Sequence, residues 1–299
     1  MNKTITMAII ALFAASCSNE YYVNVVSDEK ADDVLVPVTV HLDGFSVSME
    51  DYVTRTDPQN VADYTGVNAV TLAFYKTDGT EAYKHVQLKS DNTTFTTFGE
   101  FSLSLPMGSY TMVAVAYYNS EASPLVLTSP TAAAYTGTRA YETFAKSQDL
   151  VISNTDAVNV SATLDRIASQ LKVVSTDGKT ADVSNVRMTF SAGGKSFNPS
   201  TGLATVNTGF SNTVSNSAAV GATSTSLSFL FLATDEQTMD VTIETLDADG
   251  NTIFSKTVSD VPFKRNRITK LTGAMYTNAG TSGSFQLNTD WLTETSIAF

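Results

Sequence analysis

Short runs in which apolar and polar residues alternate, separated by tight turns, make up most of this chain of 299 residues. The first clear run is VLVPVTVHLDGF, and its apolar residues fall at every second position: Val34, Val36, Val38, Val40 and Leu42. This spacing is typical of a strand with one buried face. Pro37 lies in the opposite phase and indicates an edge position or the start of a strand. The pattern predicts a β-strand from Val34 to Leu42.

Similar runs recur in pairs that are joined by turn residues. Asp-Gly dipeptides at 78–79, 177–178 and 249–250 each lie between two runs, and Pro106-Met107-Gly108 lies between two more. Glycine accepts the positive φ that tight hairpin turns require. We therefore expect an antiparallel hairpin at each of these four places.

Helical periodicity is nearly missing from the chain. The segment that comes nearest to it is TRAYETFAKSQ, Thr138 to Gln148, and we expect at most one short helix there. The other runs predict an all-β protein, and strands of this length and spacing are typical of sandwiches. A polar stretch precedes residues 150–160, and VNVSATLDRIASQLKVV then begins a second series of runs. We expect two domains, residues 34–155 and 156–299.

Composition narrows the classes of function. The chain carries 30 acidic and 18 basic residues, which gives a net charge of −12. An acidic surface repels phosphate backbones, so we expect no nucleic-acid partner. Hydrophobic residues make up 42% of the chain and charged residues 16%, which excludes both a disordered chain and a multi-span membrane protein.

The N-terminus carries the signs of export. Its apolar run, Ile5 to Phe13, is far shorter than the ~20 residues of a membrane-spanning helix. Ala14-Ala15-Ser16 then leads to the one cysteine of the chain, Cys17. This segment resembles a bacterial lipobox, which implies cleavage between Ser16 and Cys17 and lipid on Cys17. An ordinary secretory signal is the alternative. We expect residues 1–16 to be a lipoprotein signal peptide and residues 17–33 to be a tether.

The chain offers little for catalysis. Its two histidines, His41 and His85, lie within strand patterns, and we expect both at the surface. The motifs of serine hydrolases, P-loop proteins, zinc proteases and dinucleotide-binding folds are absent from the sequence. No pair of carboxylates is singled out for glycoside hydrolysis. We expect no enzyme activity and no cofactor.

Two charged segments each have a structural and a functional interpretation. DADGN at 247–251 resembles the start of a calcium-binding loop, but Val258 stands where such a loop needs its bidentate glutamate. We expect a hairpin turn there and no metal site. The basic segment FKRNRITK at 263–270 is dense for an acidic protein, and we expect it to be the polar face or the lead-in of a strand.

Several segments together point to a known family: TRTD after the first strand, LDRIASQLKV in the second domain, and VPFKRNRITKLTGAMYT and SFQLNTDW near the end. With the lipobox, they resemble the fimbrillin superfamily, the lipoprotein pilins of Bacteroidales that build type V pili and related surface adhesins. The resemblance implies two tandem antiparallel β-sandwich domains of transthyretin-like or immunoglobulin-like type. It also implies a lipid anchor in the outer membrane, a place in a cell-surface fimbrium, and other pilin subunits as partners in a homo- or hetero-polymer.

The resemblance further implies a route of assembly. In such pilins a surface trypsin-like protease cuts after an arginine or lysine, and the first strand leaves with its lipid. A strand from a neighbouring subunit then fills the vacated groove and restores its hydrogen bonds. The matching bond joins Arg55 and Thr56 in DYVTRTDPQN, where Asp57-Pro58 favours an exposed turn. Arg55 as an ordinary loop residue is the alternative, and cleavage at Lys30 would spare the strand.

The implied donor strand is the C-terminal segment. Its apolar residues alternate in part and provide the candidate donor positions Phe285, Leu287, Trp291, Ile297 and Phe299. Such a strand either closes the sheet of its own domain or extends into the next subunit.

The leading hypothesis is therefore a structural and adhesive pilus subunit, with the stalk, tip and membrane-retained anchor roles left open. The alternative is a surface glycan-binding lipoprotein, which needs an exposed aromatic platform. Its candidates, with a host glycan or protein as the partner, are Tyr117, Tyr118, Tyr135 and Trp291. Core packing is the other interpretation of Trp291. An enzyme has no positive support in the sequence.

Overall fold

Strands account for all the regular structure in the computed structural model, which describes residues 34–46, 60–91, 93–276 and 286–287. Over these ranges the chain forms eighteen strands, grouped in four sheets, and no helix. The prediction of an all-β protein is confirmed. Nothing in these ranges forms a helix long and apolar enough to cross a bilayer.

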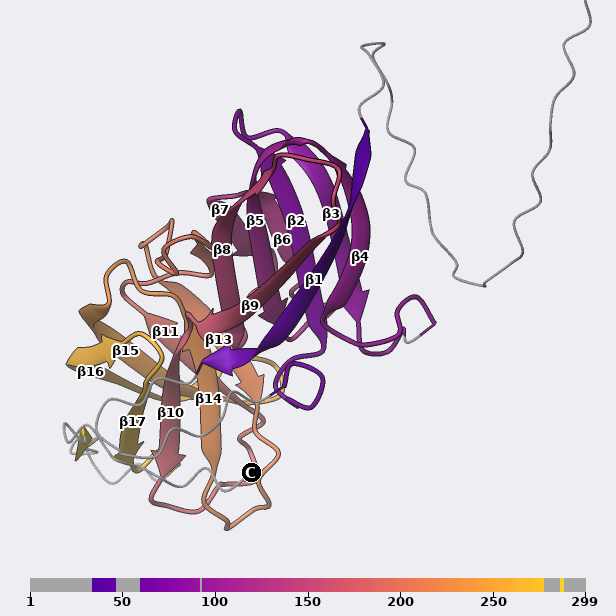
Figure 1. Ribbon diagram of the computed structural model, residues 1–299. Coiled ribbons are helices and arrows are strands. Elements are labelled where there is room, and N and C mark those ends of the chain that lie inside the picture. The colour runs from indigo at the N-terminus through magenta and orange to yellow at the C-terminus, as the bar shows by residue number, and fades with distance from the viewer. Residues whose placement is uncertain (1–33, 47–59, 92, 277–285, 288–299) are drawn as a thin grey trace, which may run out of the picture. The chain divides into compact units, whose positions relative to one another are not determined.

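The largest sheet folds over into two layers. Its strands span Leu35–Ser46 (β1), Ala69–Lys76 (β2), Glu81–Leu88 (β3), Glu100–Pro106 (β4), Gly108–Tyr117 (β5), Thr143–Ile152 (β8) and Val158–Arg166 (β9). They lie in the order β3-β2-β5-β8-β9-β1-β4. Because β8 and β9 pair only at Phe144–Arg166 and Ala145–Asp165, the sheet turns there from the layer β3-β2-β5-β8 to the layer β9-β1-β4 (Figure 1).

The first hydrophobic core lies between these two layers. Its buried side chains come from both of them: Val36, Val38, Val40, Leu42 and Phe45 of β1, Val70, Leu72 and Phe74 of β2, and Met112, Ala114 and Ala116 of β5. β1 begins at Leu35 and continues to Ser46, past the end that the sequence predicts. Pro37 is exposed near its start, one residue before pairing with β9 begins at Val38. Pro37 pairs only with Ser104 of β4, so the interpretation of Pro37 as the start of a strand is confirmed, and β1 lies between two strands from Val38 onward.

β2 and β5 are buried on both faces. A small sheet of β6 (Leu125–Ser129), β7 (Ala132–Tyr135) and β12 (Ser196–Phe197) covers the face that points away from the first core. The cluster beneath it combines residues from both halves of the chain: Ala69, Ala73 and Tyr75 of β2, Val113, Val115 and Tyr117 of β5, and Ile167, Phe197 and Phe231. A strand that is covered on both sides has no polar face, so its sequence is a continuous apolar run.

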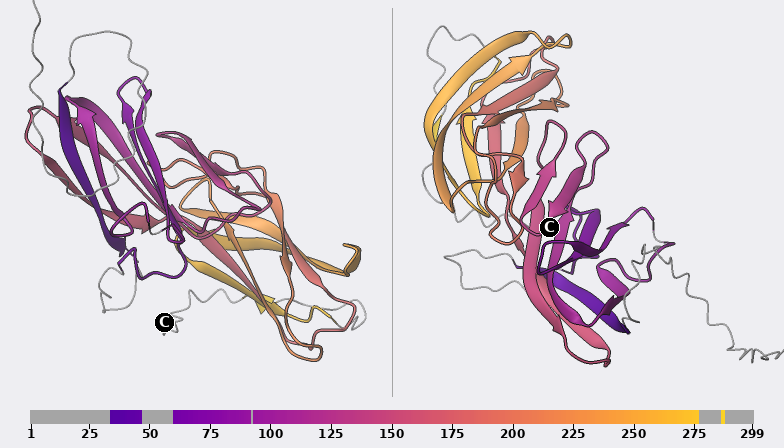
Figure 2. Two further views of the ribbon diagram at one scale, coloured as in Figure 1. Left: turned by 90° about the vertical axis from the view of Figure 1, so that its right-hand side faces the viewer. Right: turned by 90° about the horizontal axis from the view of Figure 1, so that it is seen from above.

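The second half of the chain forms two facing sheets, whose strands run from rose through orange to yellow in Figure 2. One has the order β14-β10-β17-β18, with strands Thr225–Leu230, Ser169–Ser175, Ile268–Gly273 and Gln286–Leu287. The other has the order β13-β11-β15-β16, with strands Phe210–Ser215, Asn185–Phe190, Glu236–Leu246 and Thr252–Lys264. Their inner faces enclose a separate core that includes Leu171, Val173, Leu230 and Leu271 from the first and Met188, Val241, Ile243 and Phe263 from the second.

Two of the four expected hairpins are confirmed, and two are wrong. The turn at 78–79 joins β2 to β3, and the turn at 249–250 joins β15 to β16, each as an antiparallel pair. The bend at 106–108 and the turn at 177–178 instead lead the chain from one layer or sheet to another, because β4 does not pair with β5 and β10 does not pair with β11. Turn residues specify a change of direction, while burial of the strand faces decides which strands pair.

The expected helix between Thr138 and Gln148 is also wrong. From Thr143 onward this segment is β8, which pairs with β5 over ten residue pairs, from Tyr117–Thr143 to Gly108–Ile152. Phe144 enters the first core and Ala145 the cluster on the other face. Burial on both faces outweighs the weak helical periodicity of the segment.

The second half of the chain contributes a strand to the first sheet. β9 pairs with β1 and β8, although the sequence places its residues after the expected domain boundary at 155–156. All described residues lie in one compact unit of the chain. The two-domain division and its boundaries stay a prediction.

Candidate functional site: strand β1 and its neighbours

β1 is hydrogen-bonded on both of its sides. It runs antiparallel to β4, from Leu35–Pro106 to His41–Glu100, and parallel to β9, from Val38–Val158 to Ser46–Asp165. The other pairings within this sheet are antiparallel. β1 therefore fills a slot between two strands that follow it in the chain. We call the space between β4 and β9 the β1 slot.

Burial holds β1 in this slot as firmly as its hydrogen bonds do. The five inward side chains, Val36, Val38, Val40, Leu42 and Phe45, are between 0% and 5% exposed. A fully buried side chain of this kind contributes about 1.5–3 kcal/mol, so together the five contribute about 10 kcal/mol. Removal of β1 would leave an apolar channel lined on both sides by unpaired backbone groups.

The inward residues of β1 change their spacing at one point. They follow each other at every second position up to Leu42, and the next inward side chain is Phe45. The cause is a register shift against β9 between Leu42 and Gly44, which inserts one extra residue into β1. Phe45 therefore enters the core at a position that strict alternation would give to residue 44.

Phe45 occupies an aromatic site where the two layers of the sheet meet. Its ring lies 3.9 Å from the ring of Phe144 and 5.2 Å from that of Tyr64, measured between centroids, and the Tyr64 and Phe144 rings are 5.5 Å apart. Phe144 belongs to β8, and its backbone partner Arg166 ends β9. We call the four residues Tyr64, Glu142, Phe144 and Arg166 the Phe45 subsite.

A polar network covers these rings. The Tyr64 hydroxyl donates to Glu142 Oε1 at 2.7 Å, and Arg166 Nε lies 2.8 Å from the same oxygen. Arg166 also donates through Nη2 to the Tyr64 hydroxyl at 3.1 Å, and its guanidinium lies 5.0 Å from the Phe144 ring centroid. Burial, together with the Glu142 carboxylate, raises the pKa of Tyr64 to about 12. A neutral Tyr64 hydroxyl therefore remains a donor at any physiological pH.

The backbone fits closely around this network at Gly66. A methyl group at this position would overlap with Glu142 Oε2 and with the Tyr64 ring. Tyr64 is fixed on its other side as well, because Lys89 Nζ donates to its backbone carbonyl at 2.6 Å. The Tyr64 ring and the Glu142 carboxylate therefore lie directly against the backbone at Gly66.

β4 is anchored on the side that faces away from β1. Gln87 of β3 donates through Nε2 to the carbonyl of Glu100 at 2.6 Å and accepts the Gly99 N–H at Oε1, at 2.9 Å. The Gln87 side chain is buried, and it links two strands that belong to different layers. β4 thus has an attachment that does not depend on β1.

The residues expected from the sequence to carry function are placed only in part. Ser16, Cys17, Arg55 and Thr56 lie outside the described residues, as do Phe285, Trp291, Ile297, Phe299 and the alternative site Lys30. The backbone of Leu287 pairs with Leu271 of β17 in the same chain. The assignments of lipidation, cleavage and strand donation stay predictions.

The aromatic platform expected for glycan binding is not assembled from the predicted residues. Tyr117 and Tyr135 are 3% exposed and belong to the core cluster, so the prediction is wrong for both. Tyr118 is 43% exposed, and its ring lies 5.4 Å from that of Tyr141. Arg139 lies 5.3 Å from the Tyr141 ring centroid. Trp291 lies outside the described residues.

The histidines lie at the surface, as expected. His41, on the outer face of β1, has its Nδ1 3.1 Å from Glu100 Oε1. His85 is exposed on β3, and partial burial of its ring lowers its pKa. No group of three or more histidine, cysteine or acidic side chains that could hold a metal ion occurs in the described ranges.

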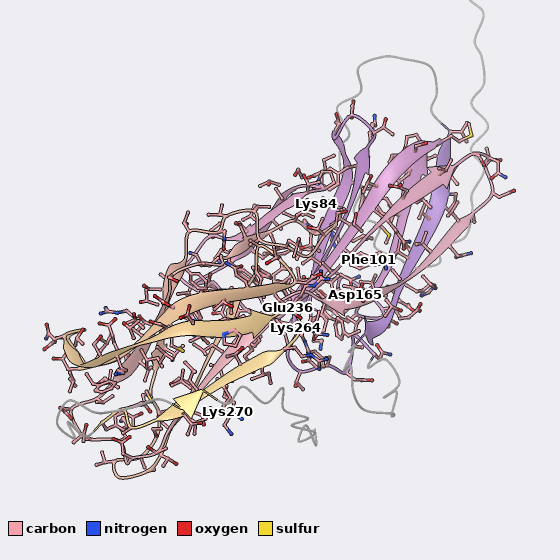
Figure 3. All side chains as sticks on the ribbon, turned by 90° about the vertical axis from the view of Figure 1, so that its left-hand side faces the viewer. Lys84, Phe101, Asp165, Glu236, Lys264 and Lys270 are labelled. Carbon is pink, nitrogen blue, oxygen red and sulfur yellow. The ribbon has the colours of Figure 1, made fainter. Side chains whose placement is uncertain are left out.

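The two charged segments have structural roles. Asp247 accepts hydrogen bonds from the N–H groups of Asp249 and Asn251 and so shapes the turn between β15 and β16. In the basic segment, Lys264 pairs with Glu236 at 3.0 Å (Figure 3), and Ile268 begins β17. The expectations of a hairpin turn and of a strand lead-in are confirmed.

Sequence reasoning missed the residues that surround β1. Gln87, Tyr64 and Glu142 stand alone in the sequence without a motif, and only Arg166 falls within a segment that the resemblance singled out. The one available signal was the break in alternation between Leu42 and Phe45.

The comparisons with known proteins agree with this architecture. The sequence profile of a family of unknown function (DUF6562) matches residues 30–297. The comparison with curated proteins gave no match. Among solved structures, the fimbrial anchor protein Mfa2 from Porphyromonas gingivalis superposes with a TM-score of 0.51 at 11% identity, over 85% of this chain and 95% of that chain. A candidate adhesin from Bacteroides ovatus gives a TM-score of 0.50 at 11% identity, over 79% and 88%.

The two kinds of match establish different things. At 11% identity, the structural likeness shows a shared fold and does not transfer a function. The family profile spans most of the chain and all of the strands described above. The chain therefore belongs to the DUF6562 family of unknown function, and its fold resembles that of the fimbrial anchor protein and of the candidate adhesin.

Proposed function

We propose that the protein is a structural and adhesive subunit of a cell-surface pilus, exported as a lipoprotein and assembled by strand exchange. The observation that carries the proposal is the place of β1. It is the first described strand, it lies between β4 and β9, and it ends nine residues before Arg55. A cut after Arg55 would leave the strand bound by non-covalent contacts alone.

The sheet around β1 suits such an exchange. An incoming strand that pairs with β4 and β9 regains the same backbone hydrogen bonds, and its inward side chains regain the burial that β1 gives up. Because Gln87 also holds β4, the slot keeps its second wall while it is empty. The C-terminal segment, with Phe285, Leu287, Trp291, Ile297 and Phe299, is the proposed donor to a neighbouring subunit.

Lipid on Cys17 would hold the subunit at the outer membrane until the cut separates it from its anchor. Names of structural relatives support this setting, because they include a fimbrial anchor protein and a candidate adhesin. They also favour a role without catalysis. A subunit that keeps its lipid and is not cut at Arg55 would be the anchor of the pilus, not its shaft.

The N-terminal residue of the protein recovered from cells tests the proposal. We expect Thr56 in surface filaments and acylated Cys17 in the membrane-bound precursor. The Arg55→Ala variant should keep its lipid and remain unpolymerised, while the matched control Lys30→Ala should assemble normally, because cleavage there spares β1. Normal filaments of Arg55→Ala would contradict the proposal, and acylated Cys17 throughout would favour the anchor role.

A second candidate function is glycan binding at the surface, and the exposed ring of Tyr118, next to the partly buried ring of Tyr141, favours it. The Tyr118 ring provides a stacking face, and the Arg139 guanidinium beside the Tyr141 ring provides a donor. A glycan array probed with the monomer tests this candidate. Binding that Tyr118→Ala abolishes supports it, and an array without signal removes it.

A further inference from the structure

Two lysines lie side by side on the outer face of the second sandwich. Lys172 of β10 pairs with Lys270 of β17, which is labelled in Figure 3. Both side chains point away from the core, because the neighbouring residues Leu171, Val173 and Leu271 point into it. Like charges on paired strands repel each other, so this pair of lysines is stabilised by a partner that carries negative charge.

Apolar side chains flank the two lysines. Leu227 of β14 pairs with Lys172 on its other side and is 39% exposed, and Ile268, two residues before Lys270 on β17, is 53% exposed. The three strands β14, β10 and β17 contain no aspartate or glutamate. We call the four residues Leu227, Lys172, Lys270 and Ile268 the lysine face. In a chain with a net charge of −12, this face suits an acidic segment that also carries apolar side chains.

A segment of this same chain starts at the edge of the sheet that carries the lysine face. Leu287 of β18 pairs with Leu271, the residue that follows Lys270. Because β18 runs antiparallel to β17, the chain leaves Leu287 in the direction of Lys270. The chain before β18 is fixed as well, since the Asp177 carboxylate accepts the Tyr276 N–H at 2.8 Å and the Tyr276 side chain is buried in the second core. Residues 288–299 are therefore tethered beside the two lysines.

We propose that residues 288–299 dock on the lysine face in the free subunit, with the carboxylates of Asp290 and Glu294 paired to Lys172 and Lys270. The inference goes beyond the proposed function and does not depend on strand exchange. For a subunit that donates its C-terminal segment, the lysine face is the place from which the segment is released.

The sequence of the segment complements the lysine face. Asp290, Leu292 and Glu294 follow each other at every second position, so an extended chain presents all three on one side. That side offers two carboxylates around an apolar side chain to two cations flanked by apolar side chains. Asp290 comes three residues after Leu287, a span of about 10 Å in an extended chain, so its carboxylate can reach Lys270. A short tether gives the segment an effective concentration on the order of 1 mM at the face, so weak surface ion pairs are sufficient to hold it.

Two measurements on the full-length protein test this inference. A carbodiimide joins a carboxylate to an amine that it contacts, so mass spectrometry of the treated protein identifies the lysines that lie against Asp290 and Glu294. Trp291 is the single tryptophan of the chain and lies between these two carboxylates in the sequence, so its fluorescence anisotropy reports whether the segment rotates with the sheet.

Three sets of substitutions accompany these measurements. Lys172→Gln with Lys270→Gln removes the charge of the lysine face. Lys76→Gln with Lys256→Gln is the matched control, because it removes the same charge from β2 and β16. The charge exchange replaces both lysines of the face by glutamate and both carboxylates of the segment by lysine, and it restores the ion pairs with the opposite polarity.

We expect cross-links that join Lys172 or Lys270 to Asp290 or Glu294. The lysine-face variant should lower the ratio of docked to undocked segment by about fivefold and lower the anisotropy, because two surface ion pairs are lost. Added salt should act in the same direction, because it screens exposed charges. The control should keep the anisotropy of the wild type, and the charge exchange should restore it. Cross-links that involve only other lysines, or equal anisotropy in the lysine-face variant and the control, would overturn the inference.

Discussion

Gln87 links the two layers of the first sandwich, and its replacement by leucine tests how β4 is held. The Gln87 side chain is 3% exposed, and its amide forms hydrogen bonds with the Gly99 N–H and the Glu100 carbonyl at the start of β4. Gln87→Leu keeps a side chain of similar size and removes both hydrogen bonds. We expect the variant to fold and to be less stable, with the loss concentrated in β4.

The size of the effect follows from the two backbone groups that lose their partner. A buried donor or acceptor without a partner costs about 1–3 kcal/mol. The Gly99 N–H is buried and Glu100 is exposed, so the carbonyl regains water in part. The sum is about 3 kcal/mol of the free energy of unfolding, out of a typical 5–15 kcal/mol. In a unit of this size it lowers Tm by about 6–12 °C.

Two measurements separate a local effect from a general one. Chemical denaturation gives the change in the free energy of unfolding, and hydrogen exchange gives the protection of each amide in β4. Gln170→Leu is the matched control, because Gln170 lies on β10 and its side chain forms no hydrogen bond with the described residues. We expect faster exchange in β4 for Gln87→Leu and no change there for Gln170→Leu. Equal stability of the two variants, or unchanged protection of β4, would refute the reasoning.

Three further predictions concern other contacts. Arg166→Met leaves the Glu142 carboxylate without its ion-pair partner and should lower the free energy of unfolding in urea by about 3 kcal/mol. The double variant Arg166→Met with Glu142→Leu should recover part of this loss. Equal losses in the single and the double variant would contradict this prediction. Arg187 donates two hydrogen bonds to Glu244 and lowers its pKa, so this contribution to stability is complete above the usual carboxyl pKa and is lost as pH falls through the folded value. The stability difference between the wild type and Glu244→Gln should therefore shrink from about pH 7 to about pH 3, and a constant difference would count against it. Asp177→Ala removes the acceptor of two backbone N–H groups after β17 and should lower the free energy of unfolding in urea by about 2 kcal/mol. An unchanged midpoint of urea unfolding would contradict this prediction.

Local sequence patterns predicted where strands and turns lie better than they predicted which strands pair. Alternation located β1 and its buried face, and Asp-Gly dipeptides located the turns of the β2–β3 and β15–β16 hairpins. The same dipeptide at 177–178 failed, because the Asp177 carboxylate accepts N–H groups from residues far along the chain and the two flanking strands belong to different sheets. Turn chemistry is local, whereas pairing depends on which faces can be buried together.

Strands that are buried on both faces lack the alternation of polar and apolar residues from which a strand is predicted. β2 and β5 lie between two cores and have no polar phase, and β8 was mistaken for a helix because its inward residues serve two different clusters. Tyr117 and Tyr135 looked like an exposed platform and are core residues for the same reason. A third layer cannot be read from the alternation of any single strand.

The sequence by itself determined the all-β class, the inward face of β1 and the acidic character of the chain, because each follows from residue types and their spacing. Only the tertiary structure decided that β1 lies between β4 and β9, and that Phe45 meets Tyr64, Glu142, Phe144 and Arg166. The physical reason is that every strand offers nearly the same backbone hydrogen bonds, so alternation fixes which face is buried and not which strand lies beside it. That choice depends on how side chains from distant parts of the chain fill one core.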